Sequence, residues 1–221
     1  MSDLSQLQIG SMRERVSRDE WDTRVNLAAC YRLVHHYGMT YDEITASSLM
    51  KIDFDGSVVQ DSGTGYGINH AGFVIHSAIH RGRPDVACVI HTHTPAGMAV
   101  SAMKCGLLPL TQNAMFFSGV GYHGYEGPAV DLGEHVAMVL RNHGLLAVGS
   151  TIPEAFITMY WLERACQAQV FALQTECEPP APETVMKTNE RYKPGQRRRI
   201  GELEWAGLLR LLERRYPGFR D

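Results

Sequence analysis

Two histidines separated by a single residue, His91 and His93, are the side chains whose type and spacing point most directly to chemistry. Successive side chains of an extended strand point to opposite faces, so these two imidazoles would share one face, with Cα atoms roughly 6 to 7 Å apart. Two neutral imidazoles at that spacing can hold one divalent cation, and imidazole suits zinc, iron, copper or nickel. By itself such a pair is more often two polar histidines at a strand end than a ligand pair, so both interpretations stay open at this point.

The residues on either side of this pair predict where it lies in the fold. Val86–Ile90 is a short apolar run typical of a buried strand. Thr94 is suited to cap a helix, Pro95 to begin one, and the helix is predicted over Ala96–Met103 with an end near Gly106. The two histidines are therefore expected at a strand-to-helix corner on the rim of a sheet, where sites are usually built.

A third histidine, His143, lies in the polar corner Arg141–Gly144 between two predicted strands, Val136–Leu140 and Leu145–Gly149. A long helix is predicted after Thr151, where a capping-box sequence begins. The remaining predicted elements are a helix from Ser17 or Asp19 to near Gly38, a hairpin over Met50–Val59, a helix from about Ala71 to His80, a strand over Ala114–Phe117 and a glycine-and-aromatic loop over Gly119–Gly127.

Composition places the chain among ordinary soluble globular proteins. It has 221 residues, 44% of them hydrophobic, and a formal net charge of -3, which suits one domain over residues 1–221 and gives no general attraction to nucleic acid or to a membrane surface. Residues 1–15 lack the apolar core of a secretory signal, and no run is long enough to span a membrane. Five cysteines without a Cys-x-x-Cys spacing indicate reduced thiols, so we expect a cytoplasmic protein.

Three separated segments resemble the class II aldolase and adducin family. They are Ala71–His80 with Arg83-Pro84-Asp85, then Val89–His93, then Leu140–Leu146, and they occur in the order and at the spacing of that family. The resemblance covers about residues 18–172. It implies a three-layer α/β/α fold with a largely antiparallel central sheet, and a homotetramer whose active sites lie between subunits. The segment from about residue 179 is then expected to form a tail and an interface helix.

The resemblance also implies a metal site. The family binds a divalent ion, usually zinc, through the histidines that correspond to His91, His93 and His143. Iron, manganese and cobalt are the alternatives that imidazole ligands leave open. Such an ion would chelate adjacent oxygens of a small-molecule substrate and stabilise the enediolate that forms when a carbon–carbon bond breaks.

Two residues depart from the sugar-phosphate aldolases of this family. Gly72 stands where those enzymes carry their catalytic glutamate, and Asn113 stands near the position of their proton-donating tyrosine. Replacement acid–base groups are expected among Tyr122, His123, Tyr125 and Glu126, with His76 as a further candidate. Each of these side chains also has a purely structural interpretation, such as packing, capping or a satisfied hydrogen bond.

The chain is also shorter than the family pattern near Gly38–Tyr41, between the first helix and the segment Tyr41–Thr45, where relatives place a Gly-Asn loop and two core strands, and again between Gly127 and Glu134. A real deletion and a sequence that omits residues both fit. Removing core strands would expose a sheet edge, which favours the second interpretation.

Three functions follow as hypotheses. The first is a divalent-metal-dependent carbon–carbon lyase, an aldolase or decarboxylase, acting on a small hydroxy acid, keto acid or sugar-acid derivative. The second is an adducin-like binding module without catalysis, which the Gly72 and Asn113 departures suggest. The third is a non-haem iron oxygenase that uses the same three histidines.

Overall fold

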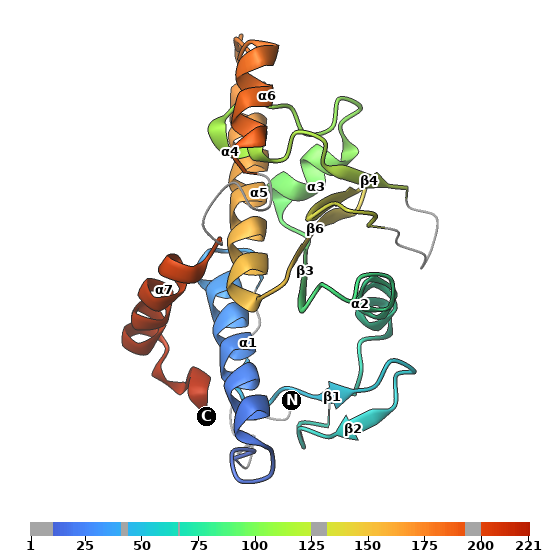
Figure 1. The fold of residues 1–221 in the computed structure, drawn as a ribbon, viewed down its shortest axis with the longest axis vertical. Helices are drawn as coiled ribbons and strands as arrows, with labels where there is room; N and C mark the ends of the chain where they lie inside the picture. The colour runs from blue at the N-terminus through green and yellow to red at the C-terminus, as the bar shows by residue number, and fades with distance from the viewer. Residues whose placement is uncertain (1–10, 41–43, 66, 125–131, 193–199) are drawn as a thin grey trace, which may run out of the picture. The chain divides into compact units, whose positions relative to one another are not determined.

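The structure is a computed structural model, and it describes residues 11–40, 44–65, 67–124, 132–192 and 200–221 (Figure 1). Its contacts divide the chain into two compact units. One consists of residues 1–77 with 205–221, and the other of residues 78–204. The prediction of a single domain with a tail from about residue 179 stays a prediction.

The unit of residues 78–204 is built on a four-stranded sheet with the order β3-β6-β5-β4. The β3–β6 and β6–β5 pairs are antiparallel, whereas β5 and β4 are parallel. The sheet is therefore largely antiparallel, and the α/β class is confirmed. The strands are β3 (Cys88–Thr92), β4 (Gly121–His123), β5 (Ala137–Leu140) and β6 (Gly144–Gly149).

The long helix α5 (Ile152–Ala172) packs against β6 and β3 and also contacts the two short helices α3 (Pro95–Ala102) and α4 (Gln112–Phe116) (Figure 1). It begins as predicted, because the Thr151 side chain accepts a hydrogen bond from the Glu154 backbone N–H at 3.2 Å. A further helix, α6 (Pro182–Glu190), contacts α4.

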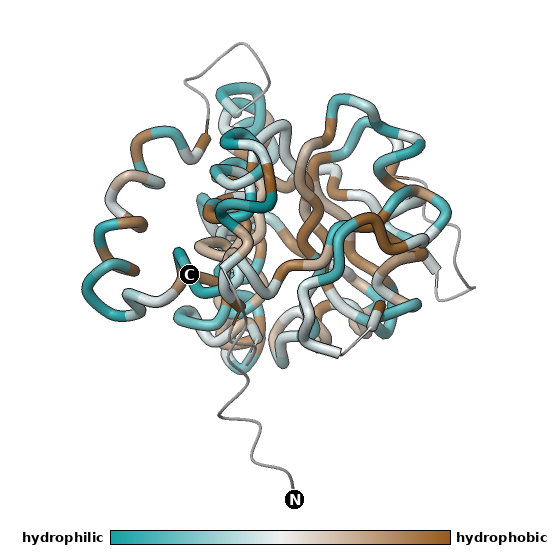
Figure 2. Tube along the Cα trace, turned by 90° about the horizontal axis from the view of Figure 1, so that it is seen from below, coloured by the Kyte–Doolittle hydropathy of each residue, from teal (hydrophilic) through white to brown (hydrophobic). Residues whose placement is uncertain are grey.

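The core of this unit lies between its sheet and α5. Every residue of β5 and β6 is buried. The trace in Figure 2 accordingly shows continuous hydrophobic stretches in its interior. On α5, the side chains of Phe156, Met159 and Leu162 are at most 1% exposed. Burial of this apolar surface is the main source of stability for the part of the sheet that carries the histidines.

The other unit contains α1 (Arg18–His36), the hairpin of β1 (Lys51–Ile52) and β2 (Val58–Gln60), most of α7 (Glu202–Arg215) and the 3-10 helix at Pro217–Arg220. The helix α2 (His70–Gly82) crosses the division. Ser17 caps α1, and β1 pairs with β2 antiparallel, as predicted. The Trp205 indole N–H donates to Asn26 Oδ1 at 2.8 Å and so links α7 to α1.

Two predicted elements are wrong. Residues Ala114–Phe117 were expected as a strand, but they belong to α4 or its end, because Thr111 Oγ1 accepts the Ala114 backbone N–H at 3.3 Å and so begins a helix. The expected loop over Gly119–Gly127 contains the strand β4, whose pairing with β5 is a tertiary contact that a glycine-rich sequence does not reveal.

Among the residues that the structure describes, no helix combines the length and the apolar character that crossing a membrane requires. All five cysteines are free thiols.

Candidate metal centre

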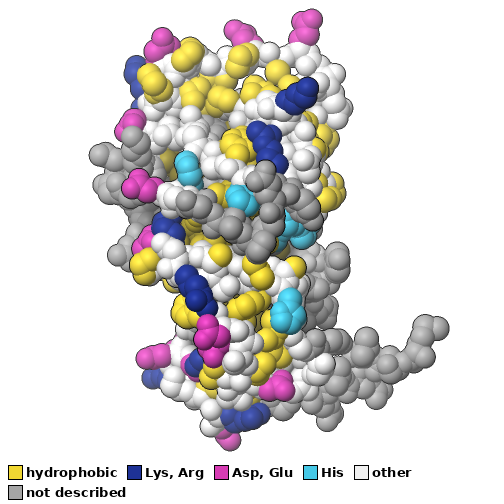
Figure 3. All heavy atoms as spheres, turned by 90° about the vertical axis from the view of Figure 1, so that its right-hand side faces the viewer, with side chains coloured by type: hydrophobic (Ala, Val, Ile, Leu, Met, Phe, Trp, Pro, Cys, Tyr) yellow, Lys and Arg dark blue, Asp and Glu magenta, His cyan; other side chains and the backbone are white. Residues whose placement is uncertain are grey.

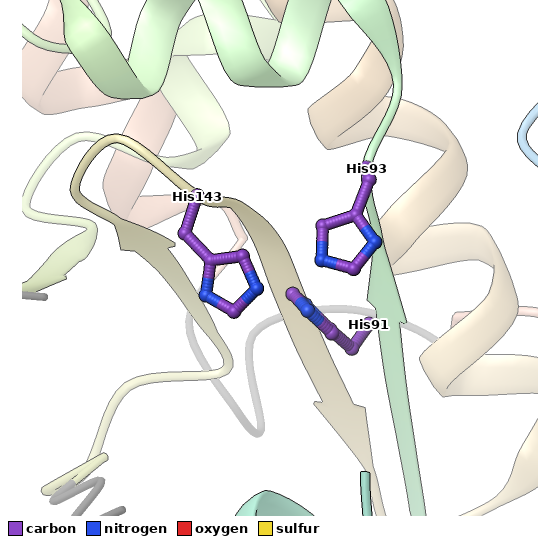
Figure 4. A group of neighbouring side chains, drawn as sticks. All are labelled: His91, His93 and His143. Atoms are coloured by element: carbon purple, nitrogen blue, oxygen red, sulfur yellow. The ribbon is translucent and has the colours of Figure 1, made fainter. Parts of the chain in front are cut away.

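His91, His93 and His143 converge on one point in space (Figure 4). The ring centroids are 4.4 Å apart for His91 and His93, 4.8 Å for His91 and His143, and 4.7 Å for His93 and His143. One nitrogen of each ring lies within 4.8 Å of the corresponding nitrogens of the other two. These three residues, which we call the histidine triad, could hold one metal ion.

The pairing of β3 with β6 brings these distant parts of the chain together. His91 lies opposite Leu146, and Thr92 lies opposite Leu145. His143 immediately precedes β6 in the corner after β5, where Asn142 adopts a left-handed conformation with φ of 56°. An asparagine tolerates this region better than most residues, so the chain turns sharply enough to present the imidazole of His143 to the other two.

A glycine is required at the start of β6. A Cβ atom on Gly144 would lie 2.3 Å from the Thr92 carbonyl oxygen and 3.2 Å from Cδ2 of His93. Only a residue without a side chain allows this close approach of the corner to the end of β3. The triad therefore depends on Gly144 although glycine offers no ligand.

Two threonines that alternate with the histidines fix the other side of the strand. Thr92 Oγ1 donates to Met159 Sδ at 3.4 Å. Thr94 Oγ1 donates to Glu163 Oε2 and accepts the Gly97 backbone N–H at 3.1 Å, which caps α3 as predicted. Both acceptor side chains belong to α5, so this helix holds the strand end in place while the imidazoles project away from it.

Glu163 was not anticipated as part of this arrangement. It is 2% exposed, and burial raises the pKa of its carboxyl group. Its Oε1 accepts a hydrogen bond from Gln167 Nε2 at 2.7 Å. The signal in the sequence was an acidic residue between Leu162 and Cys166 on the apolar face of a helix, which indicates a specific buried partner.

Hydrogen bonding orients His91 for metal binding. Its Nδ1 lies 2.8 Å from the Leu145 carbonyl oxygen, which can only accept, so Nδ1 carries the proton and Nε2 keeps a lone pair for a metal. Burial, together with the neighbouring His93, lowers the pKa of His143 and so favours the neutral imidazole that binds metals. Three imidazoles form a donor set that fits zinc and leaves a coordination position for a substrate.

The acid–base candidates have different surroundings. Tyr122 is 40% exposed, its hydroxyl accepts the Leu107 backbone N–H at 2.8 Å, and the Arg141 guanidinium lies 4.3 Å from its ring centroid. These contacts give Tyr122 a structural role in holding the loop after α3. His123 is the next residue of β4, and its Nε2 is buried. Tyr125 and Glu126 lie outside the described residues.

The other residues singled out in the sequence lie in helices. Gly72 and His76 are in α2, and Asn113 is in α4. The first expected shortening, near Gly38–Tyr41, reaches residue 41, and the second, between Gly127 and Glu134, includes residues 127–131. Residues 41 and 127–131 lie outside the described part of the chain. Whether residues are deleted or omitted there stays a prediction.

A family model described as "Class II Aldolase and Adducin N-terminal domain" matches residues 23–170. The chain belongs to this family. Among solved structures, an aldolase II superfamily protein from Pseudomonas syringae is 42% identical and superposes with a TM-score of 0.87, covering 96% of this chain and 100% of that one. L-fuculose 1-phosphate aldolase from Glaciozyma antarctica PI12 is 25% identical, with a TM-score of 0.80 and coverage of 99% and 98%.

The adducins are also relatives of this class II aldolase family member. Alpha-adducin of Rattus norvegicus is 38% identical over 234 aligned residues, which cover 90% of this chain and 32% of the adducin. The alignment is longer than the chain, so the adducin carries residues that face gaps here.

Proposed function

We propose that this protein is a divalent-metal-dependent carbon–carbon lyase, an aldolase or decarboxylase, that acts on a small hydroxy acid, keto acid or sugar-acid derivative. The observation that carries the proposal is the convergence of His91, His93 and His143 at the rim of the sheet. Membership of a family that includes class II aldolases supports it. The three histidines are proposed as the ligands and zinc as the ion, with iron, manganese or cobalt as alternatives for the same donors.

The residues around the triad have separate roles in this proposal. His91 offers Nε2 because Nδ1 is engaged with Leu145. The Thr94–Glu163 contact holds the strand end that carries His93, and Gly144 lets His143 approach. When bound, the ion would supply Lewis-acid stabilisation of negative charge on the substrate oxygens as the carbon–carbon bond breaks.

A proton acceptor and a proton donor are also needed. Tyr122, His123, Tyr125 and Glu126 stay the proposed source of these groups. Of the two that the structure describes, Tyr122 projects to the face of β4 opposite to His123, where its hydroxyl accepts the Leu107 backbone N–H, whereas the strand register places His123 on the face of the histidine triad. His123 is therefore the stronger candidate for contact with the substrate.

The test combines metal binding with turnover. We expect the purified protein to bind about one Zn²⁺ per chain in isothermal titration calorimetry, and His93→Ala to weaken that binding by more than about a hundredfold, because one of three ligands is lost. The zinc-loaded protein should then turn over at least one member of a panel of hydroxy and keto acids. His135→Ala, which removes an exposed imidazole, is the control and should bind Zn²⁺ normally. Equal affinities for wild type and His93→Ala would refute the proposed ligands.

An adducin-like binding module is the second candidate, favoured by the similarity to alpha-adducin and by Gly72 at the position of the aldolase glutamate. Zinc binding without turnover of any acid in the panel would support it. Oxygen-dependent product formation with Fe²⁺ but not with Zn²⁺ would instead identify an oxygenase. A homotetramer is proposed as the working assembly, and light scattering of the purified protein measures it.

A further inference from the structure

The imidazole of His123 lies on the same face of the sheet as the histidine triad. The register places His123 of β4 opposite Leu140 of β5, and Leu140 opposite Gly144 of β6. Thr92 pairs with Leu145, so the next residues outward, His93 and Gly144, also lie opposite each other. A Cβ atom on Gly144 would accordingly lie 3.2 Å from Cδ2 of His93. Directly opposed residues of neighbouring strands project to one face. A single row across the sheet therefore runs from His93 to His123.

Contacts on the other face of β4 fix the faces to which its side chains project. Tyr122, which precedes His123 and so points the opposite way, accepts the Leu107 backbone N–H and packs against the Arg141 guanidinium. The Arg141 guanidinium also donates to the Met103 carbonyl oxygen at 2.7 Å. These contacts fix the direction in which the imidazole of His123 projects.

The imidazole of His123 has an unused hydrogen-bonding group. Its Nε2 is buried and has no hydrogen-bond partner in the described part of the chain. Leaving such a group buried and unpaired costs about 1 to 3 kcal/mol, so native structures rarely do it without a reason. A polar group of a bound ligand would satisfy it. Figure 3 shows several histidine side chains among hydrophobic ones on the face that it presents.

The spacing of the row indicates how large that ligand would be. Two strand spacings separate β4 from β6, which is about 10 Å. An ion-to-oxygen bond of about 2 Å and a hydrogen bond of about 3 Å leave roughly 5 Å between the two ends of the ligand. Gly144 contributes no side chain to the row, so the buried Leu140 is the only side chain of the row between His93 and His123.

We propose that His123 Nε2 binds the distal carboxylate of a short hydroxy diacid whose hydroxyl and first carboxylate lie at the histidine triad. This inference rests on the proposed function and adds to it a substrate class and a residue that selects it. It assigns His123 to substrate selection, so the proton acceptor and donor are left to the other named candidates. An imidazole facing a carboxylate forms a charge-assisted hydrogen bond, which distinguishes a diacid from the corresponding monoacid.

The experiment compares malate, a hydroxy diacid, with lactate, the monoacid that lacks the distal carboxylate, on the zinc-loaded protein. We expect malate to bind at least about tenfold more tightly than lactate, since a hydrogen bond to a charged group contributes about 1.5 to 3 kcal/mol. His123→Gln and His123→Leu should lower malate affinity towards that of lactate and leave lactate and Zn²⁺ affinities unchanged. In wild type, the His123 imidazole ¹⁵N resonance, assigned by its absence from H123Q, should shift with malate and not with lactate.

His135→Gln is the matched control, because the His135 ring lies at the other end of β4, with Cδ2 3.0 Å from the position of a Cβ on Gly121. It should keep the full preference for malate. The inference is overturned if H123L keeps that preference or if wild type shows none. A wild-type chain that binds no Zn²⁺ would instead refute the proposed function and this inference together, so the two failures can be told apart.

Discussion

At the scale of single residues, several groups around the triad that are not metal ligands fix the positions of the ligand nitrogens. The carbonyl oxygen of Leu145 determines that Nδ1 of His91 carries the proton. The absence of a side chain at Gly144 allows His143 to approach the end of β3. Asn142 makes the turn that presents it. These residues supply no metal ligand, yet each one restricts where a ligand nitrogen can be.

Gly144→Ala should destabilise the protein and weaken zinc binding. The new methyl group would lie 2.3 Å from the Thr92 carbonyl oxygen, which is backbone and cannot move aside without shifting the strand end. We expect the free energy of unfolding to fall by about 1 to 3 kcal/mol in urea denaturation. The control is Gly82→Ala, where a Cβ meets nothing within 4 Å. Unchanged zinc affinity and stability for Gly144→Ala would contradict this account of the corner.

At the scale of elements, one helix supports the site from the side opposite the imidazoles. The helix α5 packs on β3 and β6 and contributes Met159 and Glu163, which receive hydrogen bonds from Thr92 and Thr94. A buried carboxyl group is costly unless it is satisfied, and Thr94 and Gln167 provide its partners. The helix and the strand end are therefore coupled by polar contacts as well as by apolar packing.

Glu163→Gln should change how stability depends on pH. Burial raises the pKa of Glu163 above its ordinary value of 4.5, so the folded state holds its proton more tightly than the unfolded state does. The contribution of Glu163 to the free energy of unfolding is fully present below pH 4.5 and is lost as pH rises through the raised pKa. The stability of Glu163→Gln relative to wild type should therefore increase over that rise in pH.

Urea denaturation at a series of pH values from about 4 to 8 measures this difference. The exposed Glu183→Gln on α6 is the control and should follow wild type across the series. A constant difference between Glu163→Gln and wild type at every pH would show that burial of Glu163 does not affect its ionisation.

At the scale of the whole molecule, the triad joins segments that are about fifty residues apart in sequence, since His91 lies in β3, His93 directly follows that strand and His143 directly precedes β6. An ion held by all three would crosslink β3 to the β5–β6 corner in the folded state only. Metal binding and folding are therefore expected to be coupled.

Zinc should stabilise the folded protein. At a free Zn²⁺ concentration a thousand times the Kd, the gain in unfolding free energy is about 4 kcal/mol, and it should appear as a higher Tm that EDTA reverses. The variant in which His91, His93 and His143 are all replaced by Ala should show no change in Tm with Zn²⁺. An equal rise in Tm for this variant would mean that zinc acts elsewhere on the chain.

Much of the site could be predicted from local sequence. The strand before His91, the cap at Thr94 and the long helix after Thr151 follow from apolar runs and capping residues, which act within a few residues of one another. The shared face of His91 and His93 follows from the two-residue period of a strand. The strand predicted over Ala114–Phe117 was wrong because an apolar run of four residues fits a helix equally well, and the Thr111 cap decided between them.

The sequence by itself determined which residues carry chemistry and which short segments are regular, because propensity, period and capping are local. The family resemblance implied that His143 joins the other two histidines, but only the tertiary structure gave the strand register that brings them together, the strand β4 within a glycine-rich segment, and the place of Glu163 beneath the strand end. Each of these depends on strand register or helix packing between residues far apart in the chain. Such contacts form through burial of surface that no local pattern identifies.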